Sequence, residues 1–165
     1  MSEFHFKQVD VFTSDSLMGN PLAVVLDADG LSDERMSAFA KWTNLSETTF
    51  LLKPVDIRAD YRVRIFTTLH ELPFAGHPTL GSCHAWLEAG GVPKGDEIIQ
   101  ECGIGLAPIN PAMAIKHTAQ NTASTTLNPG CLATRPSRRR LSRTTSHSQL
   151  RPPSRYKMLP ASNHS

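Results

Sequence analysis

With 165 residues, the chain is long enough to bury one hydrophobic core, and its length predicts a single domain. Its net charge is +2, but the charges are unevenly distributed along the chain, because all fifteen acidic residues lie between Glu3 and Glu101. No run reaches the roughly 18 apolar residues of a membrane span, and the first residues lack the basic and apolar regions of a signal peptide. We therefore expect a cytoplasmic protein that has no membrane partner.

Up to Leu52 the pattern alternates between strands and one helix. Phe4–Phe12 is strand-like, and a Gly- and Pro-containing loop separates it from a second apolar run, Leu22–Asp27. Ser32 is a typical N-cap, because its hydroxyl can accept a hydrogen bond from a free helix amide, and a helix is expected from there to about Trp42. Thr48–Leu52 is β-branched and apolar, which predicts the next strand.

The following segment predicts a strand, a helix and a further strand. Tyr61–Ile65 alternates apolar and basic residues, which is typical of a strand with one buried face in an antiparallel or mixed sheet. Pro78 suits the first turn of a helix, and an apolar stripe continues toward the two glycines at 90 and 91. Glu97–Cys102 is the last predicted strand and leads through a Gly-Ile-Gly turn into the short apolar run 106–109. These elements indicate an α/β fold class.

After Ile109 the composition changes completely. Residues 110–165 contain no Asp or Glu, nine Lys and Arg, many Ser, Thr and Pro, and no period in their apolar residues. Such a segment cannot bury enough apolar surface to offset the entropy of ordering, so we expect a partial domain over 1–109 and a disordered basic tail over 110–165. The abrupt switch resembles translation in a shifted reading frame.

Glu47 is the first residue that could carry chemistry. It lies in the stretch NLSETTF, where a helix-to-strand connection leads into an apolar strand. Partial desolvation there would favour the protonated carboxyl and suit it to proton transfer. The alternative is a solvated glutamate at a strand edge, and the residue types alone leave both interpretations open.

The second candidate is the corner Gly76-His77-Pro78 at the start of the later helix. Backbone amides there would point toward the free end of the helix and form an anion site for a carboxylate or a developing enolate. Gly76 would let a substrate approach the backbone, and the positive helix end would keep His77 neutral. The alternative is an ordinary helix start with an incidental histidine.

Other histidines and the tryptophans are weaker candidates. His70 falls in a predicted loop, and His84 lies on the apolar face of the later helix, where a packing role is expected. Trp42 and Trp86 occupy helix positions consistent with packing.

Cofactor, metal and nucleic-acid sites have little support in the sequence. The three cysteines show no CxxC and no Cys/His zinc spacing, and the chain has no GxGxxG, P-loop or HExxH motif, so we expect no cofactor and no metal. The basic run Arg138–Arg140 stands in a tail with one aromatic residue, which supports non-specific electrostatic attraction to nucleic acid at most.

Four stretches in this order resemble the phenazine biosynthesis-like (PhzF-like) isomerase family: QVDVFTSDSLMGNPLAVV, NLSETTF, RIFTTLHELPFAGHPTLGSCHAW and ECGIGL. The resemblance covers about residues 4 to 109. It implies a diaminopimelate epimerase-like fold, in which each of two similar domains has a mixed sheet curled around a central helix. It also implies cofactor-independent isomerisation, in which a proton moves from one carbon to another on a small carboxylate-bearing substrate.

The resemblance also implies roles for individual residues. Glu47 matches the acid/base glutamate of the family, and His77 matches the residue that orients the substrate. Five further positions match the substrate-binding surface: Asn20, Ser46, Gly76, Pro78 and Thr79.

The departure from the family pattern leaves three functions open. The family has a second domain of similar size, and the acid-free tail has no residue to supply its further acidic group, so we expect a truncated chain that is inactive alone. The alternatives are a non-catalytic interaction module and a weak nucleic-acid binder that uses the basic tail. Homo-oligomerisation is left open.

Overall fold

The computed structural model describes residues 4–116 and 118–127. The strands are β1 (Phe4–Val11), β2 (Asn20–Leu26), β3 (Thr48–Leu52), β4 (Tyr61–Phe66), β5 (Glu71–Leu72), β6 (Ile98–Cys102), β7 (Gly105–Ile109) and β8 (Thr118–Leu127). The helices are α1 (Asp33–Thr43), α2 (Gly76–Glu88), α3 (Pro111–Lys116) and the short 3-10 helix η1 (Ala28–Gly30).

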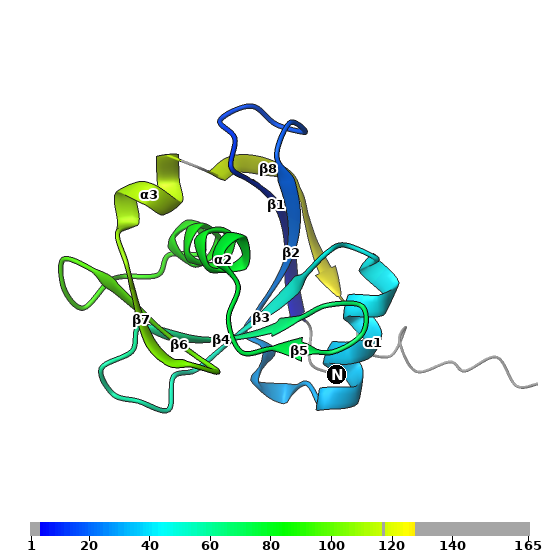
Figure 1. The fold of residues 1–165 in the computed structure, drawn as a ribbon, viewed down its shortest axis with the longest axis horizontal. Helices are drawn as coiled ribbons and strands as arrows, with labels where there is room; N and C mark the ends of the chain where they lie inside the picture. Colours follow the sequence, from blue (N-terminus) through cyan, green and yellow to red (C-terminus); the bar gives the residue numbers. More distant parts are fainter. Residues whose placement is uncertain (1–3, 117, 128–165) are drawn as a thin grey trace, which may run out of the picture. The chain divides into compact units, whose positions relative to one another are not determined.

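All these strands belong to one mixed sheet. Its order is β7-β6-β4-β3-β2-β1-β8, and β5 pairs with β4. The pairs β2–β3 and β4–β6 are parallel, whereas the other pairs are antiparallel. The sheet curves around α2, which lies on its concave side (Figure 1). The expected fold class, a mixed sheet curled around a central helix, is thereby confirmed.

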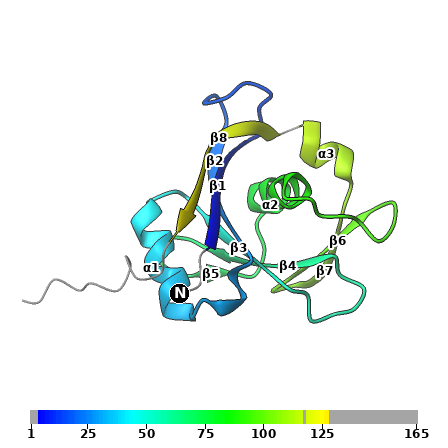
Figure 2. The ribbon, with the colours of Figure 1, turned by 180° about the vertical axis from the view of Figure 1, so that it is seen from behind.

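The two faces of the sheet bury different apolar clusters. Val63 and Ile65 point from β4 toward α2 and join its Cys83 in the larger cluster. Phe50 of β3 points to the opposite face, where it packs with Phe39 of α1. Helix α1 therefore covers the face of the sheet that turns away from α2 (Figure 2). This division follows from the two-residue period of a strand, which sends neighbouring side chains to opposite faces.

The two long helices begin in different ways. In α1 the hydroxyl of Ser32 accepts a hydrogen bond from the amide of Arg35, as its sequence predicts. In α2 the N-cap is Ala75, which has extended backbone and no side-chain cap. Helix α2 starts at Gly76, so Pro78 lies in its first turn, as the sequence predicts.

The expectation of a tail without ordered structure after Ile109 is corrected for two segments. Pro111–Lys116 forms α3, whose Ala114 is buried in the larger cluster, and Thr118–Leu127 forms β8. Strand β8 pairs antiparallel with β1 from Phe4 to Val11, with an irregularity after Gln8. Backbone hydrogen bonds along an open strand edge need no apolar period, which is why the pattern of side chains did not indicate this strand. Residues 128–165 of the predicted tail lie outside the described residues.

No helix within residues 4–116 and 118–127 is long and apolar enough to cross a membrane.

Candidate active site

Four elements meet at one edge of the sheet. Strand β1 ends and β2 begins there, because Val11 pairs with Asn20. Strands β2 and β3 are parallel with Ala23 opposite Thr48, so Glu47, directly before β3, lies at the same edge. The start of α2 faces this edge as well, since its His77 ring approaches the ring of Phe12, directly after β1. Residues 12, 20, 47 and 77 are thereby brought together from distant parts of the chain.

The carboxylate of Glu47 and the imidazole of His77 form a close pair. The Oε2 atom of Glu47 lies 3.3 Å from Nε2 of His77, and their side chains are 18% and 9% exposed. Both atoms are buried, yet neither makes an aligned hydrogen bond with any described residue. Buried polar atoms without such a partner are uncommon in folded proteins and call for a specific explanation. Nε2 of His84 is unsatisfied in the same way, so the missing hydrogen bond makes the Glu47–His77 pair a candidate for chemistry only together with its surroundings.

Burial and charge act on His77 in opposite directions. Burial lowers the pKa of His77 below its ordinary value of 6.5, and the nearby carboxylate of Glu47 partly offsets this by favouring the imidazolium. The net shift is downward, so His77 is neutral near pH 7. A neutral imidazole can donate one hydrogen bond and accept another, which suits it to orient a substrate.

The first turn of α2 presents free donors beside this pair. Ala75 provides no side-chain cap, so the amides of Gly76 and His77 are not satisfied in the way that Ser32 satisfies α1. A Cβ atom built on Gly76 would meet no heavy atom within 4 Å, so the space in front of this residue is open. An uncapped helix start next to open space favours an anionic group such as a carboxylate.

Two sets of buried hydrogen bonds hold α2 against the sheet. Ser82 of α2 donates to Thr49 of β3 over 2.9 Å, which ties the helix to the strand that follows Glu47. On the other side, the Tyr61 hydroxyl donates to Gln100 over 3.0 Å, and the Gln100 amide donates to Thr79 over 3.2 Å.

The second set reaches the N-cap of α2 itself. Thr79 Oγ1 donates to the carbonyl of Ala75 over 2.9 Å. Gln100 is fully buried, so its amide group has no solvent to exchange with. We therefore regard Gln100 as a residue that positions the helix start, a role that the sequence did not suggest. Its only signal is a polar amide at an inward position of an otherwise apolar strand.

The remaining predicted residues lie around the pair in different ways. The Thr79 hydroxyl is committed to Ala75 and Gln100, and Pro78 is buried beside it, so these two side chains support the helix start. Asn20 is half-buried at the first position of β2, and Ser46 is exposed. Within residues 4–116 and 118–127, no hydrogen bond or ion pair joins the side chain of Asn20 or Ser46 to another group. Their roles in binding a substrate stay predictions.

The other histidines and the tryptophans, which were weaker candidates, differ in their burial and contacts. His84 is buried as expected, whereas His70 is exposed in a turn closed by Thr67. Trp86 stacks on Tyr61 with ring centroids 5.3 Å apart. Trp42 contacts Phe39 but is 67% exposed, so the expected packing applies to only part of its ring.

The cysteines give no metal site among the described residues. Burial raises the pKa of the Cys83 thiol to about 12, so it stays protonated, and Cys102 is free and half-buried. No group of three His, Cys, Asp or Glu side chains within residues 4–116 and 118–127 could hold a metal ion. Cys131 and the basic run Arg138–Arg140 lie outside the described residues.

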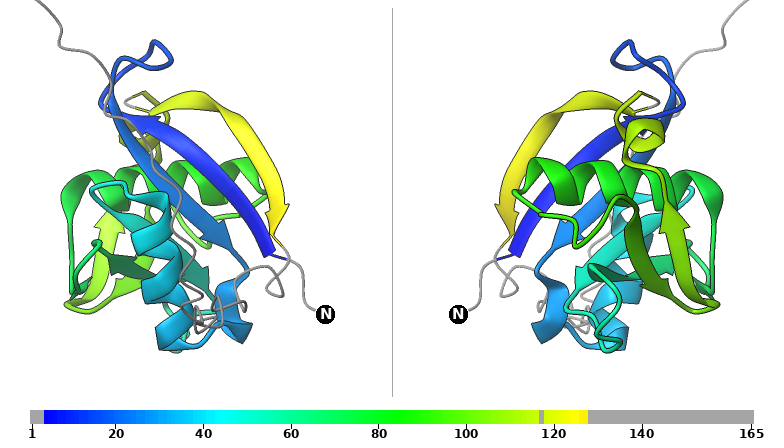
Figure 3. Two further views of the ribbon diagram at one scale, coloured as in Figure 1. Left: turned by 90° about the vertical axis from the view of Figure 1, so that its right-hand side faces the viewer. Right: turned by 90° about the vertical axis from the view of Figure 1, so that its left-hand side faces the viewer.

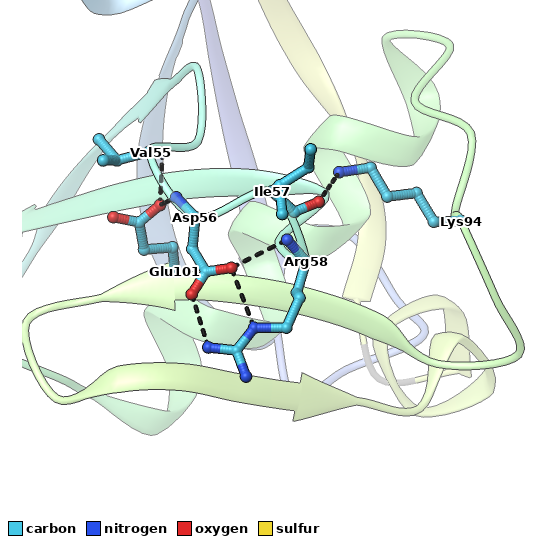
Figure 4. A network of polar contacts seen from close by, with 6 residues as sticks. All are labelled: Val55, Asp56, Ile57, Arg58, Lys94 and Glu101. Carbon is cyan, nitrogen blue, oxygen red and sulfur yellow. Dashed lines mark hydrogen bonds and ion pairs between the residues drawn. The ribbon is translucent and has the colours of Figure 1, made fainter.

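A second polar cluster lies in the loop between β3 and β4, where Glu101 accepts hydrogen bonds from the amides of Val55 and Asp56 (Figure 4). Arg58 binds the Asp56 carboxylate and lowers its pKa to about 2. The Glu101 carboxylate is thus bound by loop amides, and the Asp56 carboxylate is bound by Arg58. The cluster therefore stabilises the loop.

Comparison with known proteins gives consistent matches. The family model for phenazine biosynthesis-like proteins matches residues 9–160. Antisense-enhancing sequence 1 of Schizosaccharomyces pombe is 57% identical over 110 residues, which are 66% of this chain and 37% of that protein. The trans-2,3-dihydro-3-hydroxyanthranilate isomerase of Pseudomonas aeruginosa is 47% identical over 100 residues, which are 61% of this chain and 34% of that protein.

A solved structure agrees with these sequence matches. The crystal structure of the Bacillus anthracis phenazine biosynthesis protein of the PhzF family superposes with a TM-score of 0.60 at 36% identity, over 67% of this chain and 36% of that chain. The chain thus spans about a third of the length of the curated relatives it matches. The family-model match extends beyond Ile109, where the motif-based resemblance ends.

Proposed function

The chain belongs to the phenazine biosynthesis-like protein family, and from this premise we propose that it carries the acid/base part of an isomerase site. The proposed reaction is a cofactor-independent proton shift between two carbons of a small carboxylate-bearing molecule. The observation that carries the proposal is the Glu47–His77 pair, with Oε2 and Nε2 3.3 Å apart beside an uncapped helix start.

Each part of the site has a defined role in this reaction. The amides of Gly76 and His77 bind the substrate carboxylate at the positive end of α2. Glu47 removes a proton from a carbon next to an unsaturated or carboxylate-bearing centre, and the electron pair left behind is delocalised into that centre. The protonated Glu47 returns the proton to a different carbon, so atoms and charge balance without a co-reactant.

His77 acts beside this transfer without carrying the carbon-bound proton. Its imidazole is neutral near pH 7 and can donate a hydrogen bond to the negative charge that develops on the substrate. A charged imidazolium would instead form a tight ion pair with Glu47 and reduce its ability to act as a base. The lowered pKa of His77 therefore fits the proposed role of Glu47.

We take the proposed substrate class from the name of one relative. The Pseudomonas aeruginosa relative is an isomerase of trans-2,3-dihydro-3-hydroxyanthranilate, a name that denotes an unsaturated ring carboxylate. We infer that this chain binds a small molecule of the same general class, in a cytoplasmic setting that agrees with its free Cys83 and Cys102.

We expect little turnover by this chain alone. Among residues 4–116 and 118–127, Glu47 is the only carboxylate paired with His77, and a proton shift between two carbons benefits from groups on both sides of the substrate. The chain supplies about a third of the length of its relatives. The interaction-module and nucleic-acid alternatives have no specific contact in their favour among these residues.

A chimera tests the proposal directly. Residues 9–109 of this chain replace the matching segment of the Pseudomonas aeruginosa isomerase, and deuterium incorporation from heavy water into a substrate carbon is measured. Glu47→Gln keeps the shape of the side chain but cannot cycle a proton, so incorporation should be lost. Glu88→Gln is the matched control and should retain it. Undiminished incorporation in Glu47→Gln would exclude Glu47 as the base.

A further inference from the structure

Phe12 has an unusual backbone conformation next to the candidate site. It follows β1 directly and has a φ of 67°, in the left-handed region that bulky residues rarely adopt. Its side chain is 60% exposed, so burial in the apolar core does not compensate for this conformation. Strained residues of this kind cluster at functional sites, which makes Phe12 a candidate for a role that the fold does not need.

Neighbouring contacts hold Phe12 in place. The buried carboxylate of Asp10 accepts a hydrogen bond from the amide of Gly19 over 3.1 Å, which closes the loop between β1 and β2. A Cβ atom on Gly19 would lie 2.3 Å from the carbonyl oxygen of Val11, so only glycine allows this close approach. Figure 3 shows this loop projecting beyond the strands that it joins. The closed loop fixes the direction in which the chain leaves β1 at Phe12.

The Phe12 ring lies beside the proposed catalytic pair. Its centroid is 6.3 Å from that of the His77 ring, with the two planes tilted by 55°. His77 is 9% exposed while Phe12 is 60% exposed, so the aromatic surface available to a ligand at this point is that of Phe12. Aromatic rings at such distances favour stacked or edge contacts with other unsaturated rings.

We propose that Phe12 determines specificity at this site by selecting planar, unsaturated ring carboxylates over saturated ones. The inference rests on the proposed function, because it takes the ligand carboxylate to bind the first amides of α2. From that anchor, the ring of the ligand extends past His77 and contacts the exposed face of Phe12. A flat ring makes full contact with this face, whereas a puckered saturated ring of equal size does not.

Leu17 provides a matched control within the same loop. It also has a left-handed backbone, with a φ of 70°, and it is 84% exposed. No ring or polar contact joins Leu17 to His77 within the described part of the chain. Exposure and strain are thus shared by the two residues, and proximity to His77 distinguishes Phe12.

The test uses the chain itself and two small acids. Benzoate and cyclohexanecarboxylate are titrated separately into the protein, and the ring resonances of His77 are followed by nuclear magnetic resonance to give two dissociation constants. We expect benzoate to bind about 2- to 10-fold more tightly, the range of one aromatic contact. Phe12→Leu should bring this ratio close to one, while Leu17→Ala should leave it unchanged.

The outcomes separate this inference from the proposed function. If both acids bind and Phe12→Leu keeps the preference for benzoate, the role of Phe12 is wrong and the carboxylate site stands. If neither acid shifts the His77 resonances, the carboxylate site itself is wrong, and Phe12 has no ligand to select.

Discussion

Helix α2 carries two histidine–glutamate pairs of equal distance and different character. At its start, Nε2 of His77 lies 3.3 Å from Oε2 of Glu47, and we call this the N-terminal pair. Near its end, Nε2 of His84 lies 3.3 Å from Oε1 of Glu88, and we call this the C-terminal pair. Burial lowers the pKa of both histidines, and the carboxylate partly offsets this in both. Distance and burial alone therefore do not distinguish them.

The other contacts of the carboxylates distinguish the two pairs. Glu88 lies four residues after His84 on the same helix and also binds Nζ of Lys7 from β1, 3.3 Å from its Oε2 atom. Glu47 comes from a different element and has His77 as its only ion-pair partner among the described residues. A proton can therefore leave or join the N-terminal pair without breaking another ion pair. The C-terminal pair therefore has a structural role, and the catalytic role that we propose belongs to the N-terminal pair, whose carboxylate has no second ion-pair partner among the described residues.

The largest expected contrast is in reaction rate. In the chimera, His77→Ala should lower the rate roughly 10² to 10³-fold, the usual effect of losing one donor to a developing negative charge. His84→Ala should leave the rate nearly unchanged and instead lower the free energy of unfolding by about 1–3 kcal/mol, because His84 is buried. Rates are compared at equal folded concentration, checked by near-ultraviolet circular dichroism. Equal rate losses in the two variants would contradict the distinction between the pairs.

Two glycines of α2 offer a second contrast, between binding and stability. A Cβ atom at Gly76 would meet no heavy atom within 4 Å, so Gly76→Val should change the free energy of unfolding by less than about 1 kcal/mol while blocking benzoate from the helix start. A Cβ atom at Gly81 would lie 2.6 Å from Leu22 and 2.8 Å from Val11, so Gly81→Val should destabilise the fold by about 1–3 kcal/mol or more. Benzoate titration and denaturant unfolding measure the two effects. Unchanged benzoate binding in Gly76→Val would remove Gly76 from the site.

A smaller contrast concerns the groups that hold each end of α2. Gln100→Leu leaves the buried Tyr61 hydroxyl without its acceptor and should lower the free energy of unfolding by about 1–3 kcal/mol. Lys7→Gln removes a partly exposed ion pair with Glu88 and should cost less than about 1 kcal/mol. Urea unfolding compares the variants directly. A larger loss for Lys7→Gln would mean that the C-terminal end of α2 governs its placement.

The smallest expected effect is a dependence of stability on pH. The folded chain holds His77 and His84 neutral, so below their ordinary pKa of 6.5 the unfolded chain binds more protons than the folded chain. The stability from these two groups is fully present above pH 6.5 and is lost as the pH falls through 6.5 toward their lower folded pKa values. His84→Gln should flatten this dependence in urea unfolding at a series of pH values. A dependence as steep as in the parent would assign it to other groups.

The sequence predicted those parts of the molecule that depend on local patterns. Strand Thr48–Leu52 has the predicted bounds, and Ser32 caps α1 as its residue type indicates. Residue types and position made Glu47 and His77 candidates but left each with an ordinary alternative, and the resemblance to a known family then gave them specific roles. Their 3.3 Å contact depends on the parallel pairing of β2 with β3 and on the packing of α2, which no local pattern encodes.

The features that the sequence did not predict arise from tertiary structure. Gln100 gains its role from a hydrogen bond to Thr79, and these residues are 21 positions apart. Phe12 is notable only through its left-handed backbone and its distance from His77. Strand β8 pairs with β1 through backbone hydrogen bonds. Such pairing requires no apolar period in the sequence, so the sequence pattern did not indicate this strand.

A nuclear magnetic resonance titration of His77 shows whether Glu47 and His77 form an isolated pair in which the charge of one group sets the pKa of the other. We expect a pKa of His77 below 6.5 in the parent chain, because the effect of burial outweighs that of the carboxylate. Glu47→Gln should lower this pKa further, since it removes the charge that favours the imidazolium, while Glu88→Gln should leave it unchanged. A His77 pKa that does not respond to Glu47→Gln, or that responds equally to Glu88→Gln, would contradict the account.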